Sequence, residues 1–165
     1  MSKTKLIANI GVGIALYVVV SMLLNIPLGV RHIRLDLGYI VYTVYLALFG
    51  YYGIPVGVIG CCIKGYISDG WIPFTWMIGQ VLIGVVCARV FSRTFSNTHW
   101  IIAIIASVFL GIAIVSSGLS AIMFHIPIGV KIAAGAVAAA SDAFVMIVGI
   151  PIAKKLIFHF GRFQW

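Results

Sequence analysis

The polar residues best suited to holding a solute gather in one short stretch of an otherwise apolar chain. Residues 31–36 read Arg-His-Ile-Arg-Leu-Asp. The forked donors of Arg31 and Arg34 suit a carboxylate or a carbonyl group, with His32 between them, and Asp36 can accept from an amine or a ring N–H. We expect either a loop that closes over a bound polar solute or a solvated loop with an Arg–Asp pair.

Two further ionisable residues stand inside apolar runs, where a helix bundle in lipid needs no charge. Lys64 lies near one end of its run, so its long side chain either reaches the membrane surface or contacts a solute. Asp142 lies near the middle of the last run, where an unpaired carboxylate is costly. Solute binding, pairing with Lys64 and a hydrogen-bonded neutral acid all remain open for Asp142.

An aromatic segment, 70–76, leads into the amide side chain of Gln80. Trp71 and Trp76 either anchor the chain at the membrane interface or stack on a flat heterocycle. Gln80 lies one helical turn beyond Trp76 and offers both a donor and an acceptor. His125 and Lys131 flank a later break between apolar runs and would close the same cavity. The predicted solute-binding set is therefore Arg31, His32, Arg34, Asp36, Tyr39, Lys64, Trp71, Trp76, Gln80, His125, Lys131 and Asp142.

The sequence shows no catalytic constellation. It has no phosphate-binding Gly-x4-Gly-Lys-Ser/Thr loop, no HExxH, and no Ser/His/Asp set or paired carboxylates. Cys61, Cys62 and Cys87 lack metal-ligand spacing and read as small buried residues. We expect no catalytic residues, no metal and no cofactor, so energy for any active transport must come from another chain.

The elements that position these residues are expected to be membrane-spanning helices. The 165 residues are 63% hydrophobic and 8% charged, with a mean hydropathy of +1.20, against about 25% charged in a soluble domain. Continuously apolar runs favour helices over a barrel. We predict an all-α membrane protein, a six-transmembrane-helix bundle forming a single integral membrane domain over 1–165. The expected spans are 6–26, 37–50, 54–68, 73–91, 100–124 and 130–157.

Two features of this prediction need comment. The second and third spans are short and could instead form one broken hairpin. The run that starts at Leu6 is about as long as a full span and lacks a small-residue cleavage site, so we interpret it as the first helix and not as a signal peptide.

The basic residues predict the orientation in the membrane. The net charge of +8 comes from basic residues at the ends of apolar runs, which indicates membrane topology and not nucleic-acid binding. With the N-terminus inside, seven basic residues are cytoplasmic and three lie in outer loops, so both termini are expected inside. The cytoplasmic seven are Lys3, Lys5, Arg89, Arg93, Lys154, Lys155 and Arg162, and the outer three are Arg31, Arg34 and Lys131.

Small residues mark one face of the first span. Ala8, Gly11 and Ala15 stand at i, i+3 and i+7 and so share a helix face. Such faces allow helices to approach closely. We expect this one to pack inside the bundle or to meet a partner protein.

Together these features resemble the S component, the substrate-binding membrane subunit, of an energy-coupling factor (ECF) transporter. The resemblance covers nearly the whole chain. Its motifs are residues 11–17, 25–28, 33–37, 48–50, 56–60, 71–76, 134–136, 141–142, 149 and 154–155.

The resemblance implies a six-helix fold with a pocket near the outer face, in the cytoplasmic membrane of a bacterium. It implies a vitamin or vitamin precursor as substrate, bound without covalent chemistry. It also implies a transmembrane scaffold subunit, on which residues 11–17 would dock, and two ATPase subunits. Substrate release by toppling within the membrane would follow.

Three other interpretations remain open. The chain could be a small autonomous proton-coupled carrier with Asp142 as its titrating group. It could be a small intramembrane enzyme that acts on lipid, or a structural membrane subunit that binds no ligand.

Overall fold

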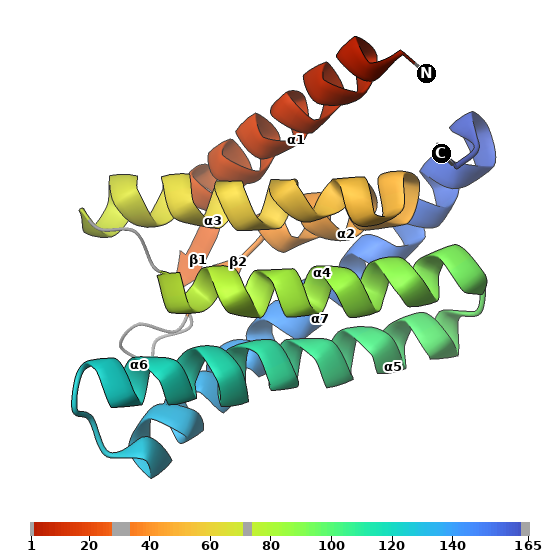
Figure 1. The fold of residues 1–165 in the computed structure, drawn as a ribbon. Helices are drawn as coiled ribbons and strands as arrows, with labels where there is room; N and C mark the ends of the chain where they lie inside the picture. The colour runs from red at the N-terminus through yellow and green to blue at the C-terminus, as the bar shows by residue number, and fades with distance from the viewer. Residues whose placement is uncertain (1, 28–33, 71–73, 163–165) are drawn as a thin grey trace.

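Long apolar helices form nearly all of the structure. The computed structural model describes residues 2–27, 34–70 and 74–162. The helices are α1 (Lys3–Leu23), α2 (Gly38–Phe49), α3 (Ile54–Asp69), α4 (Phe74–Arg93), α5 (Asn97–Val108), α6 (Ser117–Met123) and α7 (Ile128–Phe160). A 3-10 turn, η1 (Gly50–Gly53), joins α2 to α3, and a π-helical segment, η2 (Phe109–Ser116), joins α5 to α6. Figure 1 shows the helices packed side by side, with α1 inclined across the others.

Five helical runs in the described residues are long and apolar enough to cross a membrane. They cover 3–23, 38–68, 74–93, 97–123 and 128–160. Only 22% to 50% of each run is buried inside the protein, so apolar side chains cover much of the outer surface. Such a surface suits lipid and not water. The protein is therefore a multi-pass membrane protein by length and composition.

The run 38–68 contains two antiparallel helices. The chain turns at Gly50, whose φ of +58° favours glycine. A Cβ at Gly57 would lie 2.5 Å from the ring of Tyr42, and one at Gly53 would lie 2.6 Å from the carbonyl oxygen of Tyr45. These pairings run in opposite directions, so α2 and α3 form a tight hairpin. The predicted helices at 37–50 and 54–68 are confirmed as elements, while a count of six membrane crossings stays a prediction.

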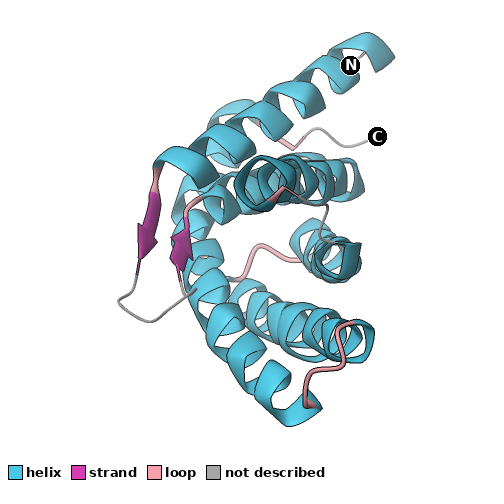
Figure 2. Ribbon diagram, turned by 90° about the vertical axis from the view of Figure 1, so that its left-hand side faces the viewer, coloured by secondary structure: helices cyan, strands magenta, loops and turns pink. Residues whose placement is uncertain are grey.

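A short β-hairpin interrupts the helices, and its second strand includes part of the loop expected at residues 31–36. Strands β1 (Asn25–Pro27) and β2 (Arg34–Asp36) pair antiparallel, with Asn25 opposite Asp36 and Pro27 opposite Arg34. Figure 2 shows this hairpin beside the end of α1 and the start of α2. Pairing in the sheet satisfies backbone groups that would otherwise lack partners where the chain leaves the helices.

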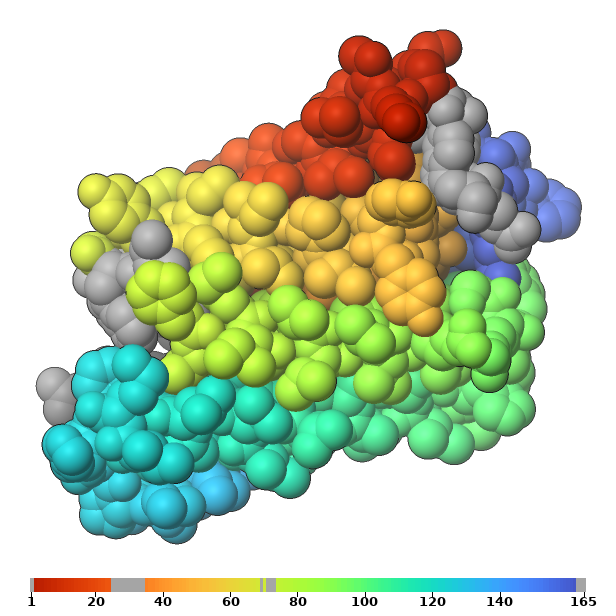
Figure 3. All heavy atoms as spheres, viewed as in Figure 1, coloured from red at the N-terminus to blue at the C-terminus, as the bar shows by residue number. Residues whose placement is uncertain are grey.

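The run 97–123 is one continuous rod with a wide central segment. The hydroxyl of Ser116, in η2, contacts the carbonyl of Gly111 at 2.7 Å, and that of Ser117, the first residue of α6, donates to the carbonyl of Ile112 at 2.9 Å. These side-chain contacts reach carbonyls five residues back, the spacing at which backbone N–H groups find their acceptors in a π-helix. The one proton of the Ser116 hydroxyl is shared between Gly111 and the carbonyl of Thr75 at 2.9 Å, and the second contact connects the rod to α4. Figure 3 shows α3, α4 and the α5–α6 rod in contact along one face.

Both termini lie at one end of the molecule and the β-hairpin lies toward the other (Figures 1 and 2). The basic residues of α1, α4 and α7 that were predicted to face the cytoplasm lie at the end of the bundle where both chain termini lie. There Lys154 donates to the side-chain oxygen of Asn97 at 2.5 Å and stands 4.6 Å from the ring centre of Phe95. Arg162 donates to the carbonyl of Ser92 at 2.9 Å. These contacts tie the end of α7 to the α4–α5 turn.

Candidate substrate-binding site

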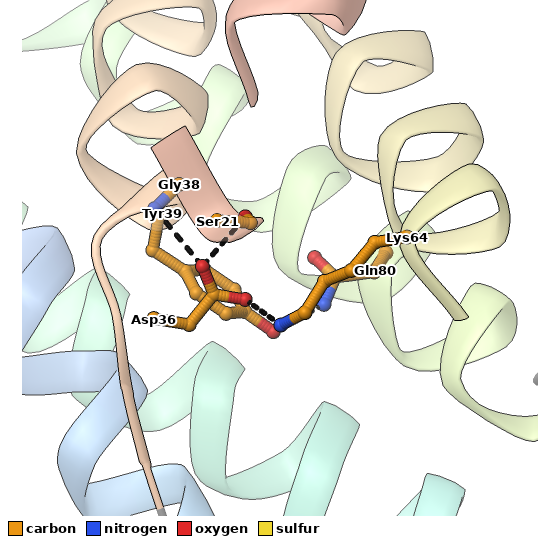
Figure 4. Close-up of polar contacts among 6 residues, drawn as sticks. All are labelled: Ser21, Asp36, Gly38, Tyr39, Lys64 and Gln80. Carbon is orange, nitrogen blue, oxygen red and sulfur yellow. Dashed lines mark hydrogen bonds and ion pairs between the residues drawn. The ribbon is translucent and has the colours of Figure 1, made fainter. Parts of the chain in front are cut away.

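Asp36 joins four elements at the hairpin end of the bundle. One carboxylate oxygen accepts from the hydroxyl of Ser21 in α1 at 2.6 Å and from the backbone N–H of Gly38 at 3.0 Å. The other oxygen accepts from the ammonium group of Lys64 in α3. Figure 4 shows these contacts converging on one carboxylate. Asp36 is only 6% exposed, so this buried charge is fully paired, as its position demands.

A second polar chain lies next to the first and runs through Tyr39. The side-chain N–H of Gln80 in α4 donates to the hydroxyl of Tyr39 at 2.5 Å. Asp142 in α7 interacts with Tyr39 from the neighbouring helix. All three residues are buried. The other amide atom, Gln80 Oε1, has no hydrogen-bond partner among the described residues.

Electrostatic interactions connect these two groups of polar side chains, one around Asp36 and one around Tyr39. Asp142 interacts with both Asp36 and Lys64. The ring of Tyr39 meets that of Tyr17 edge to face, with centroids 6.1 Å apart. We define the polar network as Ser21, Asp36, Gly38, Tyr39, Lys64, Gln80 and Asp142. It draws on β2 and on helices α1, α2, α3, α4 and α7, so the whole bundle must fold to assemble it.

Tyr42 fixes the backbone on which Gln80 stands. Its hydroxyl donates to the carbonyl oxygen of Gln80 at 2.7 Å, and its side chain is fully buried. A Cβ at Gly84, one turn further along α4, would lie 2.5 Å from that hydroxyl. Glycine at position 84 therefore leaves room for Tyr42 to reach α4 and to hold Gln80 in place.

The structure unites part of the predicted set. Asp36, Tyr39, Lys64, Gln80 and Asp142 belong to the polar network. Trp76 lies one turn before Gln80 on the same face of α4, half-buried and packed against the core.

The remaining predicted residues lie elsewhere or cannot be placed. His125, exposed and with a φ of +53°, and the half-buried Lys131 lie around the α6–α7 turn, outside the network. Arg31, His32 and Trp71 fall outside the described residues. Arg34 lies in β2, and only its backbone is described.

The structure bears on two pairings considered from the sequence. Lys64 was one of three alternatives for Asp142, but its ammonium group pairs with Asp36. The reason is topological: the α2–α3 hairpin returns α3 to the end of the bundle where β2 enters α2, which sequence distance does not reveal. Pairing of Asp36 with a neighbouring arginine stays a prediction, because the side chains of Arg31 and Arg34 are not described.

A family model now adds independent information. The model of the ECF-type riboflavin transporter S component family matches residues 1–157. This match covers nearly the entire chain. The chain belongs to this family. The resemblance inferred from the sequence is thereby confirmed, and the family is one of transporter subunits and not of enzymes.

Curated relatives of this S component carry uninformative names. A UPF0397 protein, YdcD, of Lactococcus lactis subsp. lactis is 34% identical over 88 residues, which are 53% of this chain and 48% of the relative. A UPF0397 protein of Streptococcus pneumoniae (strain Hungary19A-6) is 37% identical over 83 residues, which are 50% and 45% of the two chains. The chain spans about half the length of the curated relatives it matches.

The fold of this S component also matches a solved structure. The S component for biotin from an ECF-type ABC transporter superposes with a TM-score of 0.64 at 16% identity, over 94% of each chain. At that identity the match concerns the fold alone. An ECF S-component fold is therefore shown for the chain as a whole.

The small-residue face of this S component is open. Ala8, Gly11 and Ala15 are all exposed on α1, and a Cβ at Gly11 would meet nothing within 4 Å. Gly13, by contrast, faces inward, where a Cβ would lie 2.5 Å from the ring of Tyr45. Of the two expectations for this face, internal packing is therefore excluded.

Sequence reasoning missed three members or supports of the network. Ser21 is a lone hydroxyl at the end of an apolar helix, Gly38 contributes only its backbone, and Tyr42 lies in a run of core residues. None of them has a motif. The one available signal was the period of α2, because Tyr39 and Tyr42 stand at i and i+3 and so share a face.

Proposed function

We propose that this protein is the substrate-binding subunit of an ECF-type importer. It captures a vitamin or vitamin precursor at the outer face and delivers it through a transmembrane scaffold subunit driven by two ATPase subunits. The chain forms one membrane domain with six crossings and both termini in the cytoplasm of a bacterial cell. Riboflavin, named in the family description, and biotin, named for the structural neighbour, are the first substrates to test.

The observation that supports this proposal best is the polar network itself. Two carboxylates, a lysine and an amide are costly inside an apolar bundle, and such residues within membrane segments mark functional sites by default. Asp142 is 5% exposed and Gln80 is 0% exposed. Packing alone would be served as well by apolar side chains, since buried ion pairs add little to stability.

The hydrogen bonds divide the network into two roles. Both oxygens of Asp36 are already occupied by Ser21, Gly38 and Lys64. Asp36 and Lys64 therefore position the β-hairpin against α1 and α3, and so shape the entrance. Tyr39, Gln80 and Asp142 form the part of the site that meets the solute.

The side of the membrane follows from the fold and the charges. The basic ends of α1, α4 and α7 lie with the termini, away from the polar network. The positive-inside rule places that basic end in the cytoplasm. The network then lies toward the outer face, where an importer must collect its substrate.

Surface chemistry supports a membrane partner. The run 3–23 has the smallest buried share of the five, 22%, and Ala8, Gly11 and Ala15 form an open strip on it. Helices in lipid associate closely through small residues. We assign this strip to the contact with the scaffold subunit.

Two measurements test the proposal. Native mass spectrometry of protein purified in mild detergent should detect one small molecule bound in 1:1 ratio. Uptake of that molecule into cells should require co-expression of the scaffold and both ATPase subunits. Uptake by this chain alone in vesicles, driven by a proton gradient and abolished by Asp142→Asn, would instead establish the autonomous carrier.

A further inference from the structure

Gln80 holds an acceptor that no described residue of the protein uses. Its side chain is fully buried, and its Oε1 atom has no hydrogen-bond partner within residues 2–27, 34–70 and 74–162. Buried polar atoms in native proteins are nearly always paired, so an acceptor without a partner at a polar site calls for one from outside the described residues. The amide is held firmly, because Tyr42 fixes its backbone carbonyl and Tyr39 fixes its Nε2 atom.

The direction of the hydrogen bonds explains why an acceptor, and not a donor, is left over. The side-chain N–H of Gln80 donates to the hydroxyl of Tyr39, so the Tyr39 oxygen is the acceptor of this bond. The amide therefore lies with its nitrogen on Tyr39 and its oxygen pointing away from Tyr39.

The surroundings of Gln80 disfavour an anionic group at this position. Lys64, the cation of the polar network, is already paired with Asp36. A carboxylate placed at Gln80 Oε1 would set one oxygen lone pair against another with no proton between them. A neutral N–H donor meets neither obstacle. Trp76, one turn earlier on the same face, adds a flat apolar side chain.

We propose that Gln80 Oε1 accepts a hydrogen bond from a ring N–H of the transported solute. The solute class is then a planar ring that carries a lactam, imide or ureido N–H. This inference rests on the proposed function, because it names the chemical group that the substrate-binding site selects. The solute reaches Gln80 from the side of Lys64, whose side chain is 24% exposed.

The test compares each N–H compound with its N-methyl derivative on the purified full chain. The probes are riboflavin and biotin, each with the matching ring N-methyl compound, and binding is measured by isothermal titration calorimetry. For at least one pair, methylation should weaken binding to the wild type by about 100-fold or more, because the buried acceptor is then left unpaired.

Variants separate the hydrogen bond from steric effects. Gln80→Ala removes the acceptor and opens space, so its affinities for the N–H compound and for the N-methyl compound should differ by no more than about threefold. Gln80→Met keeps the volume, and its affinity for the N–H compound should be about ten- to 100-fold lower than that of the wild type. Thr75→Val, which alters another buried polar residue of α4, should leave the selectivity unchanged.

Three outcomes decide the matter. The pattern above supports the inference. Equal binding of both members of a pair to the wild type, retained in Gln80→Met, would overturn the inference and leave the importer function standing. A wild-type protein that binds none of the four probes and carries no co-purified solute would overturn both. Melting temperatures of unliganded Gln80→Ala and Gln80→Met verify that each variant is folded.

Discussion

Lys64 and Asp36 form a salt bridge that closes the hairpin end of the bundle. The two residues are unequally buried, with side-chain exposures of 24% and 8%. Lys64 can still reach water without its partner, whereas Asp36 cannot. This asymmetry leads to the first prediction.

Removing the lysine should destabilise the protein more than neutralising the aspartate. Lys64→Met leaves a buried carboxylate without its counter-charge, at a cost of about 3 kcal/mol. Asp36→Asn keeps an oxygen for Ser21 and Gly38 and leaves an unpaired ammonium group whose side chain is 24% exposed, so we expect a loss of about 1 kcal/mol. The measurement is the melting temperature in detergent, with intrinsic fluorescence as the signal that reports unfolding.

The double variant and a control complete this experiment. Asp36→Asn with Lys64→Met should recover most of the loss of the single lysine variant, because neither charge remains. Lys131→Met removes another half-buried lysine outside the network and should change the melting temperature little. Equal losses for both single variants would contradict the unequal burial on which the prediction depends.

Gly84→Ala should disturb the support of Gln80. The new Cβ would lie 2.5 Å from the hydroxyl of Tyr42 and 2.8 Å from Cγ1 of Ile54. We expect a loss of about 1–3 kcal/mol from overpacking, together with weaker solute binding. Gly118→Ala is the control, since a Cβ there meets nothing within 4 Å, and helix propensity favours alanine by up to about 1 kcal/mol. Similar melting temperatures for the two variants would argue against a tight contact at position 84.

Gly11→Leu should separate binding from transport. The leucine side chain would project from an open position on α1, so fold and solute affinity should stay at wild-type values. Uptake in cells that contain the scaffold and ATPase subunits should fall at least about tenfold, because the close helix approach is blocked. Val12→Leu, at an exposed neighbouring position, serves as the control. Uptake at the wild-type rate by the Gly11→Leu variant would contradict the proposal that this face contacts the scaffold subunit.

Labelling of single cysteines tests the orientation. In a background where Cys61, Cys62 and Cys87 are replaced, cysteine is introduced at Ser68 or at Thr98, both exposed at opposite ends of the bundle. A membrane-impermeant maleimide applied to intact cells should label position 68 and spare position 98 until the cells are broken. The reverse pattern would place the polar network on the cytoplasmic side and end the capture proposal.

Lys154 should matter more than its neighbour Lys155. Lys154 donates to Asn97 and stands over the rings of Phe95 and Trp100, at 4.6 and 5.0 Å from their centres. Lys154→Met should lower stability by about 1 kcal/mol, the scale of one cation–π contact with a hydrogen bond. Lys155→Met, at an exposed position, should have no measurable effect on the melting temperature, and a matching loss there would contradict this assignment.

Sequence patterns predicted most of the helices because their signal is local. Apolar runs bounded by proline, glycine and charge set the limits of α1, α4 and α7 to within a few residues of the expected spans. The same reasoning selected Asp36, Lys64, Gln80 and Asp142, since a polar residue in an apolar run costs free energy unless it has a purpose.

Pairings across the bundle could not be predicted in this way. Lys64 meets Asp36 and Gln80 meets Tyr39 across 28 and 41 positions of sequence, and only the order of helices in space decides such contacts. The β-hairpin was missed for a similar reason, because three-residue strands are too short for a period of two to be visible. The π-helical segment η2 has no known sequence mark and was not expected.

The shortness of α2 has a consequence for how far it reaches across the membrane. Its 12 residues rise about 18 Å, against a hydrocarbon core of about 30 Å. Tyr51 and Tyr52, exposed in η1, are suited to anchor that turn at the headgroups. The opposite end of α2, with Tyr39, then stops about 12 Å below the far boundary. Most of α2 is buried by the other helices, so the depth that it leaves uncovered lies inside the bundle, on the side where β2 leads into α2.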